Sequence, residues 1–79
     1  MEISQLKYFC AVAKYQNISK ASRNMYVTQP TLSQSIKRLE TELGVSLFDR
    51  YGKSITLNTY GHVVQRYADH IFQQLEDME

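Results

Sequence analysis

A stripe of four apolar residues, flanked by residues that start and stop helices, is the feature that most restricts what this chain can fold into. The stripe recurs at intervals of four, three and four positions: Leu32, Ile36, Leu39 and Leu43. This spacing puts the four side chains on one face of an α-helix. Thr28 is a good N-cap, Pro30 is tolerated in a first helical turn, and Gly44 is a common C-terminal stop. The pattern predicts a helix over residues 29–43.

Two shorter helical patterns precede this one. The first is predicted by apolar residues with helical spacing: Ile3, Leu6, Phe9, Cys10 and Ala13. The second is predicted to begin at Ser19, as its N-cap, and to end near Tyr26, with Ala21 and Met25 four positions apart on one face. Only a tight connection then remains before the third helix. Residues 18–37 therefore form a candidate helix-turn-helix.

The period of the sequence changes after residue 47. Ile55 and Leu57 alternate with polar residues, and Gly52 marks a turn before them, so a small β-hairpin is predicted over residues 47–58. A final helix is predicted from residue 59 to the end. The expected fold class is mainly α: a winged helix-turn-helix of three helices plus a two-stranded β wing in residues 1–58, followed by a long C-terminal dimerisation helix in residues 59–79.

The last helix carries more apolar surface than so small a domain can cover. Twenty helical residues are about 30 Å long, and the surplus surface is most simply covered by the same helix of a second copy. The alternative is a long amphipathic helix that lies wholly on its own core. The residues expected to form the dimer contact are Tyr60, Val64, Tyr67, Ile71 and Leu75.

Length and composition exclude several classes of protein. Seventy-nine residues allow one small domain, too short for a barrel or a doubly wound sheet. A single cysteine excludes an intramolecular disulfide and favours a reducing, cytoplasmic setting. No apolar run approaches the roughly 20 residues that span a bilayer, so no membrane association is expected.

Charge is unevenly distributed behind a net value of +1. Residues 14–53 hold seven bases and three acids, whereas the rest of the chain holds two bases and five acids. A basic middle segment indicates contact with a polyanion.

The outer face of the third helix has the chemistry to read DNA. It is polar or basic and carries no acid before Glu40. Gln can contact adenine with two hydrogen bonds, Ser and Thr fit base edges or phosphates, and Lys and Arg suit phosphate. A basic wing beside this helix would reach the minor groove or the backbone. An ordinary solvated helix face is the alternative. The residues predicted to bind DNA are Thr28, Gln29, Pro30, Thr31, Ser33, Gln34, Lys37, Arg38, Arg50 and Lys53.

No enzymatic site, cofactor or metal is expected. His62 and His70 are eight positions apart, too far for a metal-binding pair one helical turn apart. Cys10 lies on an apolar stripe and is expected to be a small core residue. The chain also has no glycine-rich phosphate loop.

Five fragments in a fixed order resemble the N-terminal winged helix-turn-helix of LysR-type transcriptional regulators. The family has S-Q-P-A-L-S-x-x-I-x-x-L-E where this chain has T-Q-P-T-L-S-Q-S-I-K-R-L-E over residues 28–40. The other fragments are L-x-x-F at residues 6–9, S-K-A-S at 19–22, E-L-G-V-S-L-F-D-R at 42–50 and I-T-L-N-T-Y-G at 55–61. Their spacing is that of the family over nearly the whole chain.

This resemblance implies sequence-specific, dimeric binding of double-stranded DNA at a partly palindromic operator, and regulation of transcription. It implies base reading through Gln29, Pro30, Ser33 and Gln34, with Arg50 as the wing arginine. Gln34 stands where the family often has Arg, which changes the expected base preference. The family also has a C-terminal effector-binding domain, which this sequence lacks. A small-molecule effector and any higher oligomer are therefore expected only of a full-length protein.

One rival interpretation belongs to another functional class. A winged-helix module could serve only protein–protein association, with the apolar last helix as its working surface. Such a module has no reason to keep acids off residues 28–38 or to carry bases at Lys37, Arg38, Arg50 and Lys53. Salt-dependent binding to duplex DNA would discriminate between the two interpretations.

Overall fold

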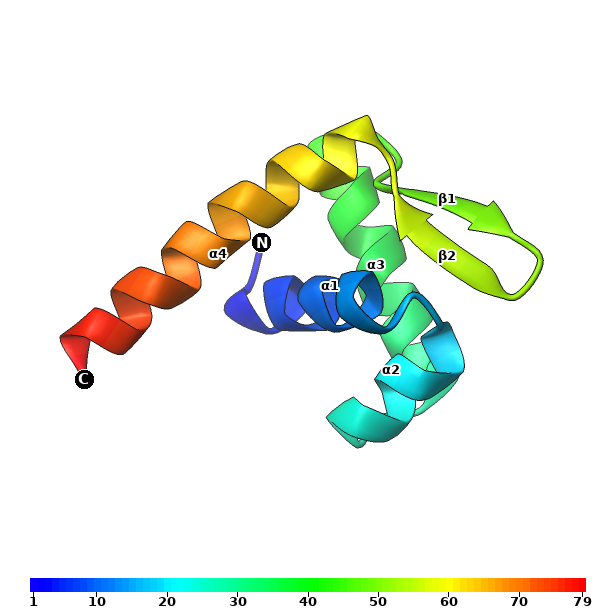
Figure 1. Ribbon diagram of the computed structural model, residues 1–79, viewed down its shortest axis with the longest axis horizontal. Helices are drawn as coiled ribbons and strands as arrows, with labels where there is room; N and C mark the ends of the chain where they lie inside the picture. Colours follow the sequence, from blue (N-terminus) through cyan, green and yellow to red (C-terminus); the bar gives the residue numbers. More distant parts are fainter.

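The computed structural model describes all residues from 1 to 79 and contains four helices and one hairpin (Figure 1). The first three helices pack against one another, and the hairpin projects at the opposite end of the molecule from the C-terminus. The elements are α1 (Ile3–Tyr15), α2 (Ile18–Met25), α3 (Gln29–Leu43), β1 (Phe48–Tyr51), β2 (Ser54–Leu57) and α4 (Thr59–Met78). The predicted fold class, a winged helix-turn-helix with a long C-terminal helix, is confirmed.

Local sequence signals set the ends of α3. The Thr28 hydroxyl accepts a hydrogen bond from the Thr31 backbone N–H, and Pro30 lies in the first turn, where a missing N–H costs nothing. Gly44 ends the helix with a φ of 75°, in the left-handed region that glycine tolerates best. The start of α2 differs from the prediction. Its N-cap is Asn17, whose side chain accepts from the Lys20 N–H, and not Ser19.

Apolar residues from every element meet in one core. The Phe9 and Phe48 rings lie 5.4 Å apart between centroids and join α1 to the wing. Leu43, the last residue of the predicted α3 stripe, is 37% exposed, so the buried part of the stripe ends at Leu39. The buried apolar residues are Leu6, Phe9, Ala11, Val12, Ala21, Leu32, Ile36, Leu39, Leu47, Phe48, Ile55 and Ala68.

The wing is a two-stranded antiparallel hairpin. Phe48 pairs with Leu57 and Arg50 with Ile55, and Gly52 in the turn has a φ of 60°. The Ile55 N–H donates to the Gln16 carbonyl at 3.2 Å, which attaches β2 to the end of α1. The wing is therefore held to the helices by its inner strand and by buried side chains at its base.

Helix α4 begins inside the fold and ends outside it. Asn58 caps its first turn by accepting from the Gly61 N–H at 2.8 Å. Ala68, near its middle, is fully buried, whereas Met78 near its end is 83% exposed. In Figure 1 the helix runs obliquely away from the hairpin toward the C-terminus. No helix in the chain combines the length and the apolar character that crossing a membrane requires.

Candidate nucleic-acid interface

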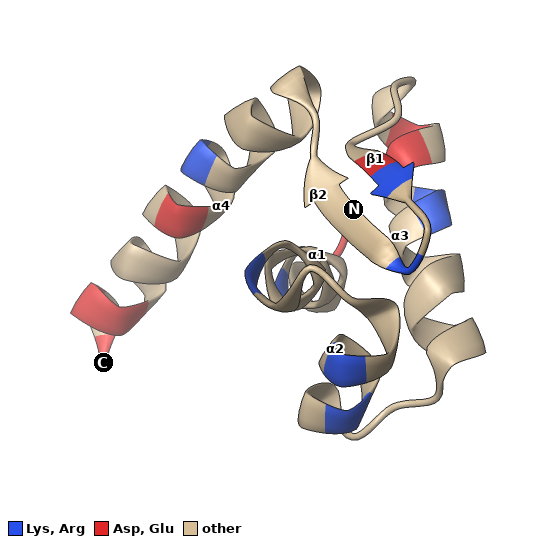
Figure 2. Ribbon diagram, turned by 45° about the vertical axis from the view of Figure 1, so that its right-hand side comes forward, with Lys and Arg blue, Asp and Glu red and all other residues tan.

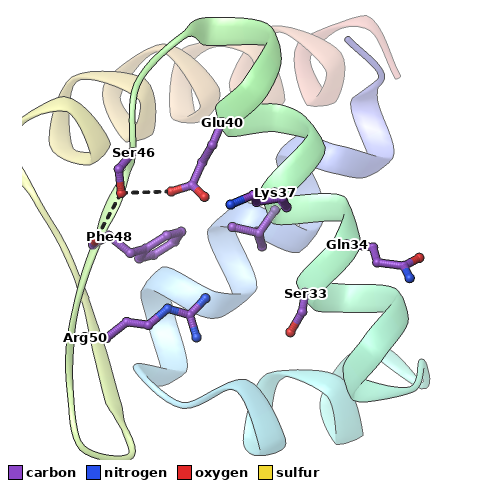
Figure 3. A pocket seen from close by; sticks show the side chains of 8 residues that line it. Ser33, Gln34, Lys37, Glu40, Ser46, Phe48 and Arg50 are labelled. Carbon is purple, nitrogen blue, oxygen red and sulfur yellow. Dashed lines mark hydrogen bonds between the residues drawn. The ribbon is translucent and has the colours of Figure 1, made fainter.

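The side of α3 opposite the core is the polar face expected from the sequence. The side chains at its N-terminal end, from Thr28 to Thr31, are exposed, as is Gln34, while Ser33 is half-buried. Figure 3 shows Gln34 pointing away from the wing and Ser33 lying on the side that faces it. The two residues therefore offer hydrogen-bonding groups to different sides of the helix, an amide to the open side and a hydroxyl to the wing side.

A groove of about 440 Å³ separates α3 from the wing. Strand pairing puts Arg50 on the same side of β1 as Phe48, two positions earlier. The Arg50 side chain points across the groove toward α3 (Figure 3). Arg50 thus lies on the first strand of the wing, before the turn, whereas Lys53 lies within the turn. The groove is lined by Ser33, Gln34, Ile36, Lys37, Glu40, Ser46, Phe48 and Arg50.

The cations of this surface are free of internal partners. The only ion pair in the structure joins the Met1 ammonium to Glu42 at 3.0 Å. This ammonium holds the pKa of the exposed Glu42 carboxyl below its usual range, mainly by hydrogen bonding. No Lys or Arg side chain forms an ion pair, and Lys37, Arg38, Arg50 and Lys53 are all exposed. Four cations near one helix face are thus available to an external polyanion.

Charge is unevenly distributed over the elements of the fold. Figure 2 shows Lys and Arg on every helix and on the wing, and Asp and Glu gathered toward the C-terminal end of α4, with further acidic segments at the end of α3 and the start of β1. The first half of α3, residues 29–36, carries no charge at all. Neutral hydrogen-bonding groups therefore occupy the part of α3 nearest its N-terminus, and cations surround them.

Two exposed bases on α2 were not among the residues predicted to bind DNA. Lys20 and Arg23 are exposed and unpaired. In a helix-turn-helix the first helix crosses the DNA backbone while the second enters the major groove. Because the predicted motif already placed Lys20 and Arg23 on its first helix, this docking geometry could have identified both as phosphate contacts from the sequence.

Glu40 is a further residue that sequence reasoning did not assign to the site. It lies in the groove beside Lys37 but forms no ion pair. Its carboxylate instead accepts a hydrogen bond from the Leu47 N–H at 2.7 Å and another from the Ser46 hydroxyl at 3.2 Å. Figure 3 shows the hydrogen bond from Ser46. The Leu47 N–H and the Ser46 hydroxyl reach Glu40 only because of the path of the loop after α3. No local sequence pattern predicts that path.

The residues predicted to form a dimer contact divide between two sides of α4. Val64 and Ile71 pack partly against the core of their own domain. Tyr60, Tyr67 and Leu75 are exposed, and Tyr67 is 70% exposed. Part of the predicted stripe thus covers its own domain, and part remains without a partner in the chain.

A second, largely apolar groove of about 740 Å³ lies between α1 and the outer half of α4. Cys10 and Phe72 contribute to it from opposite sides, and basic side chains of α1 face acidic ones near the end of α4. Burial, reinforced by the negative charge of Asp69, raises the pKa of the Cys10 thiol to about 11. This thiol stays protonated at neutral pH and is a poor nucleophile and metal ligand. No three His, Cys, Asp or Glu side chains converge as a metal site would require.

Comparison with known sequences agrees with this geometry. The profile of a family described as bacterial regulatory helix-turn-helix protein, lysR family, matches residues 3–62. The uncharacterized HTH-type transcriptional regulator YybE of Bacillus subtilis (strain 168) is 54% identical over 66 residues, which cover 84% of this chain and 23% of that protein. The chain spans about a quarter of the length of the curated relatives that it matches.

Solved structures match over almost the entire chain. The BenM DNA-binding domain in complex with benA site 1 DNA is 35% identical, with a TM-score of 0.93 over 99% of this chain and 91% of that one. BenM itself is an HTH-type transcriptional regulator of Acinetobacter baylyi. The CbnR DNA-binding domain in complex with DNA is 36% identical, with a TM-score of 0.93 over 99% of this chain and 90% of that one.

Proposed function

The chain belongs to the LysR family of bacterial regulatory helix-turn-helix proteins, a family of regulators and not of enzymes, and from this premise we propose that it binds double-stranded DNA and regulates transcription. Helix α3 enters the major groove, and the wing contacts the minor groove or the backbone beside it. The observation that carries the proposal is the near-complete structural match to two domains that were solved in complex with DNA.

The proposed roles follow the chemistry of each side chain. Gln29, Pro30, Ser33 and Gln34 contact base edges, since they are neutral and lie on the outer face of α3. Cationic side chains neutralise phosphates on both sides of the helix. The residues proposed to contact phosphate or sugar are Thr28, Thr31, Lys37, Arg38, Arg50 and Lys53, together with Lys20 and Arg23 of α2.

We further propose that the domain acts as a homodimer through α4. One recognition helix covers only a few base pairs, too few to define a site among the competing sequences of a genome. The two copies are joined through Tyr60, Tyr67 and Leu75, with Val64 and Ile71 beneath them. Such a dimer reads two half-sites, and its two-fold symmetry predicts a partly palindromic operator. The exposed aromatic side chains of α4 support this contact, because they have no partner within the chain.

The remaining properties belong to a longer regulator of this family. A small-molecule effector, if sensed, binds outside residues 1–79, and oligomers larger than the dimer involve that region too. Because the DNA of a bacterium lies in its cytoplasm, the proposed function implies a cytoplasmic location.

A salt titration tests the proposal against the rival of a protein–protein module. The probes are a duplex selected from a random library by this chain and a random-sequence duplex, each labelled for fluorescence anisotropy. Binding to both should weaken as salt rises, with a slope of about −0.9 for each phosphate neutralised, and the selected duplex should bind more tightly. Absence of binding at low salt, or a slope near zero, would overturn the proposal and favour the protein–protein module.

A further inference from the structure

Glu40 collects hydrogen bonds from four consecutive residues at the end of α3. Its backbone carbonyl accepts from the N–H groups of Gly44 at 2.8 Å and Val45 at 3.2 Å. Its carboxylate accepts from the Ser46 hydroxyl at 3.2 Å and from the Leu47 N–H at 2.7 Å. One residue of the recognition helix therefore fixes the path of the loop that leads into the wing.

The same loop holds the far end of the wing and the start of α4. Asn58, which follows β2, donates its backbone N–H to the Leu47 carbonyl at 3.0 Å and its side-chain amide to the Ser46 carbonyl at 2.8 Å. The Ser46 hydroxyl also lies 3.2 Å from the Phe48 carbonyl, at the first residue of β1. Both strands of the wing thus depend on the two residues that the Glu40 carboxylate holds.

The negative charge of Glu40 is unfavourable for DNA binding. The carboxylate lines the groove between α3 and the wing, where the other charged residues are the cations Lys37 and Arg50. An acid there repels DNA phosphates, and no Lys or Arg forms an ion pair with it. Reach, and not charge, is therefore the useful property of this side chain, because a shorter or apolar residue could not accept from the Leu47 N–H.

We propose that Glu40 is a positioning residue that sets the distance between the wing and the recognition helix, so that Arg50 and α3 contact the same stretch of DNA. This inference rests on the proposed function and deepens it. Glu40 does not itself contact DNA. Its effect on binding passes through the Leu47 N–H, the base of the wing and Arg50.

Three substitutions at Glu40 separate reach from charge. E40Q keeps an acceptor oxygen at the same reach and removes the charge, whereas E40D keeps the charge and is one methylene shorter. E40A removes both. If reach matters, E40Q binds the selected duplex at least as tightly as the wild-type chain, while E40D and E40A lose about tenfold, the equivalent of one hydrogen bond. If charge were the important property, E40D would bind like the wild-type chain and E40Q would lose affinity.

A double-mutant cycle with Arg50 identifies the route of the effect. Each Glu40 variant is combined with R50A, and binding is measured by anisotropy at fixed salt, with circular dichroism confirming that every variant is folded. In the R50A background, E40D and E40A should reduce affinity for the duplex little further. The reason is that these substitutions act by displacing the DNA contact of Arg50, which R50A has already removed. Should E40A fail to fold, E40D completes the cycle.

The outcomes separate this inference from the function on which it rests. If the wild-type chain binds no duplex, the proposed function fails and the inference falls with it. If the wild-type chain binds and the Glu40 and Arg50 losses simply add, only the inference fails. A loss with E40Q equal to that with E40A, or an R50A variant that binds normally, would also overturn it while leaving DNA binding intact.

Discussion

Gly61, in the first turn of α4, lies directly against the backbone carbonyl of Leu47. A β-carbon at position 61 would overlap that oxygen atom, and the Leu57 side chain would be its next neighbour at 2.8 Å. The Leu57 side chain can rotate, but the Leu47 carbonyl is held by the Asn58 N–H. The glycine is therefore required by close approach of backbone to backbone, and it seats α4 on the loop that enters the wing.

Gly61→Ala should lower the free energy of unfolding by about 1–3 kcal/mol, as overpacking of a tight site does. The sign of this change in the free energy of unfolding is informative, because replacing glycine by alanine at an open helical position raises the free energy of unfolding by about 1 kcal/mol. Urea denaturation measures the change, and Gln74→Ala, at an exposed position of the same helix, is the control. A Gly61→Ala variant that is more stable than the wild-type chain would show that the loop can move away from α4.

Gln29→Ala should weaken binding to the selected duplex by about 1–3 kcal/mol and change binding to a random duplex little. The reason is that an exposed amide at the start of α3 can read a base edge but adds no charge toward phosphate. Ser33→Ala is expected to behave in the same way from the wing side of the helix. Anisotropy with both duplexes checks this, and equal losses on the two would remove these residues from base reading.

Arg50→Ala should weaken binding to every duplex and reduce the salt slope by about 0.9, the value for one neutralised phosphate. If the guanidinium instead enters a narrow minor groove, the loss is larger for sites with A/T-rich flanks. Lys7→Ala is the matched control, because Lys7 is an exposed cation on α1, far from the groove beside α3. Equal effects of the two substitutions would mean that overall charge, and not the wing, governs binding.

Tyr67→Asp should produce a monomer that remains helical and binds a full operator little better than a half-site. A charge buried in an apolar seam costs several kcal/mol, whereas Tyr67 is 70% exposed in the isolated chain and its loss should not disturb the core. Ile71→Asp is a poorer test, since Ile71 packs against its own domain. Analytical ultracentrifugation at matched concentration gives the answer, with Gln73→Asp, on another side of α4, as the control. A dimeric Tyr67→Asp variant would mean that the contact lies elsewhere.

Cys10 should react slowly with iodoacetamide at pH 8. Because burial raises the thiol pKa from 9.0 to about 11, the thiolate fraction in the folded chain is about 100-fold lower than in the unfolded chain. Between these two values the unfolded chain releases a proton that the folded chain retains, so this group lowers stability as pH rises above 9. Mass spectrometry of alkylation, with and without concentrated urea, measures the ratio. Equal rates would show that the thiol is open to solvent and ionises normally.

Local chemistry explains why the recognition helix was predictable from sequence. Thr28, Pro30 and Gly44 each act within one turn of the end that they define, so the chain alone carries the information. The hairpin was equally local, since Gly52 and the alternation at Ile55 and Leu57 mark its turn and its inward face. The exposed, polar outer face of α3 followed from the same periodicity.

Features that depend on how elements meet were not predictable in this way. Helical periodicity predicts one apolar surface on α4, but packing against the core divides it, so that Val64 and Ile71 face inward while Tyr67 faces outward. Glu40 carried no signal because its partners, Ser46 and Leu47, approach it only after the chain turns at Gly44. The flank position of Arg50 likewise depends on strand register.

The seating of α4 at Gly61 has a mechanical consequence for how a dimer would tolerate different operators. The helix is a lever about 30 Å long, and a tilt of about 10° at its root displaces its far end by about 5 Å. That displacement exceeds the rise of one base pair, about 3.4 Å. In a dimer, the stiffness of the first turn of α4, where Gly61 allows close backbone contact, therefore limits how far the helix can tilt. This limit decides whether the dimer can bind two half-sites whose spacing differs by one base pair.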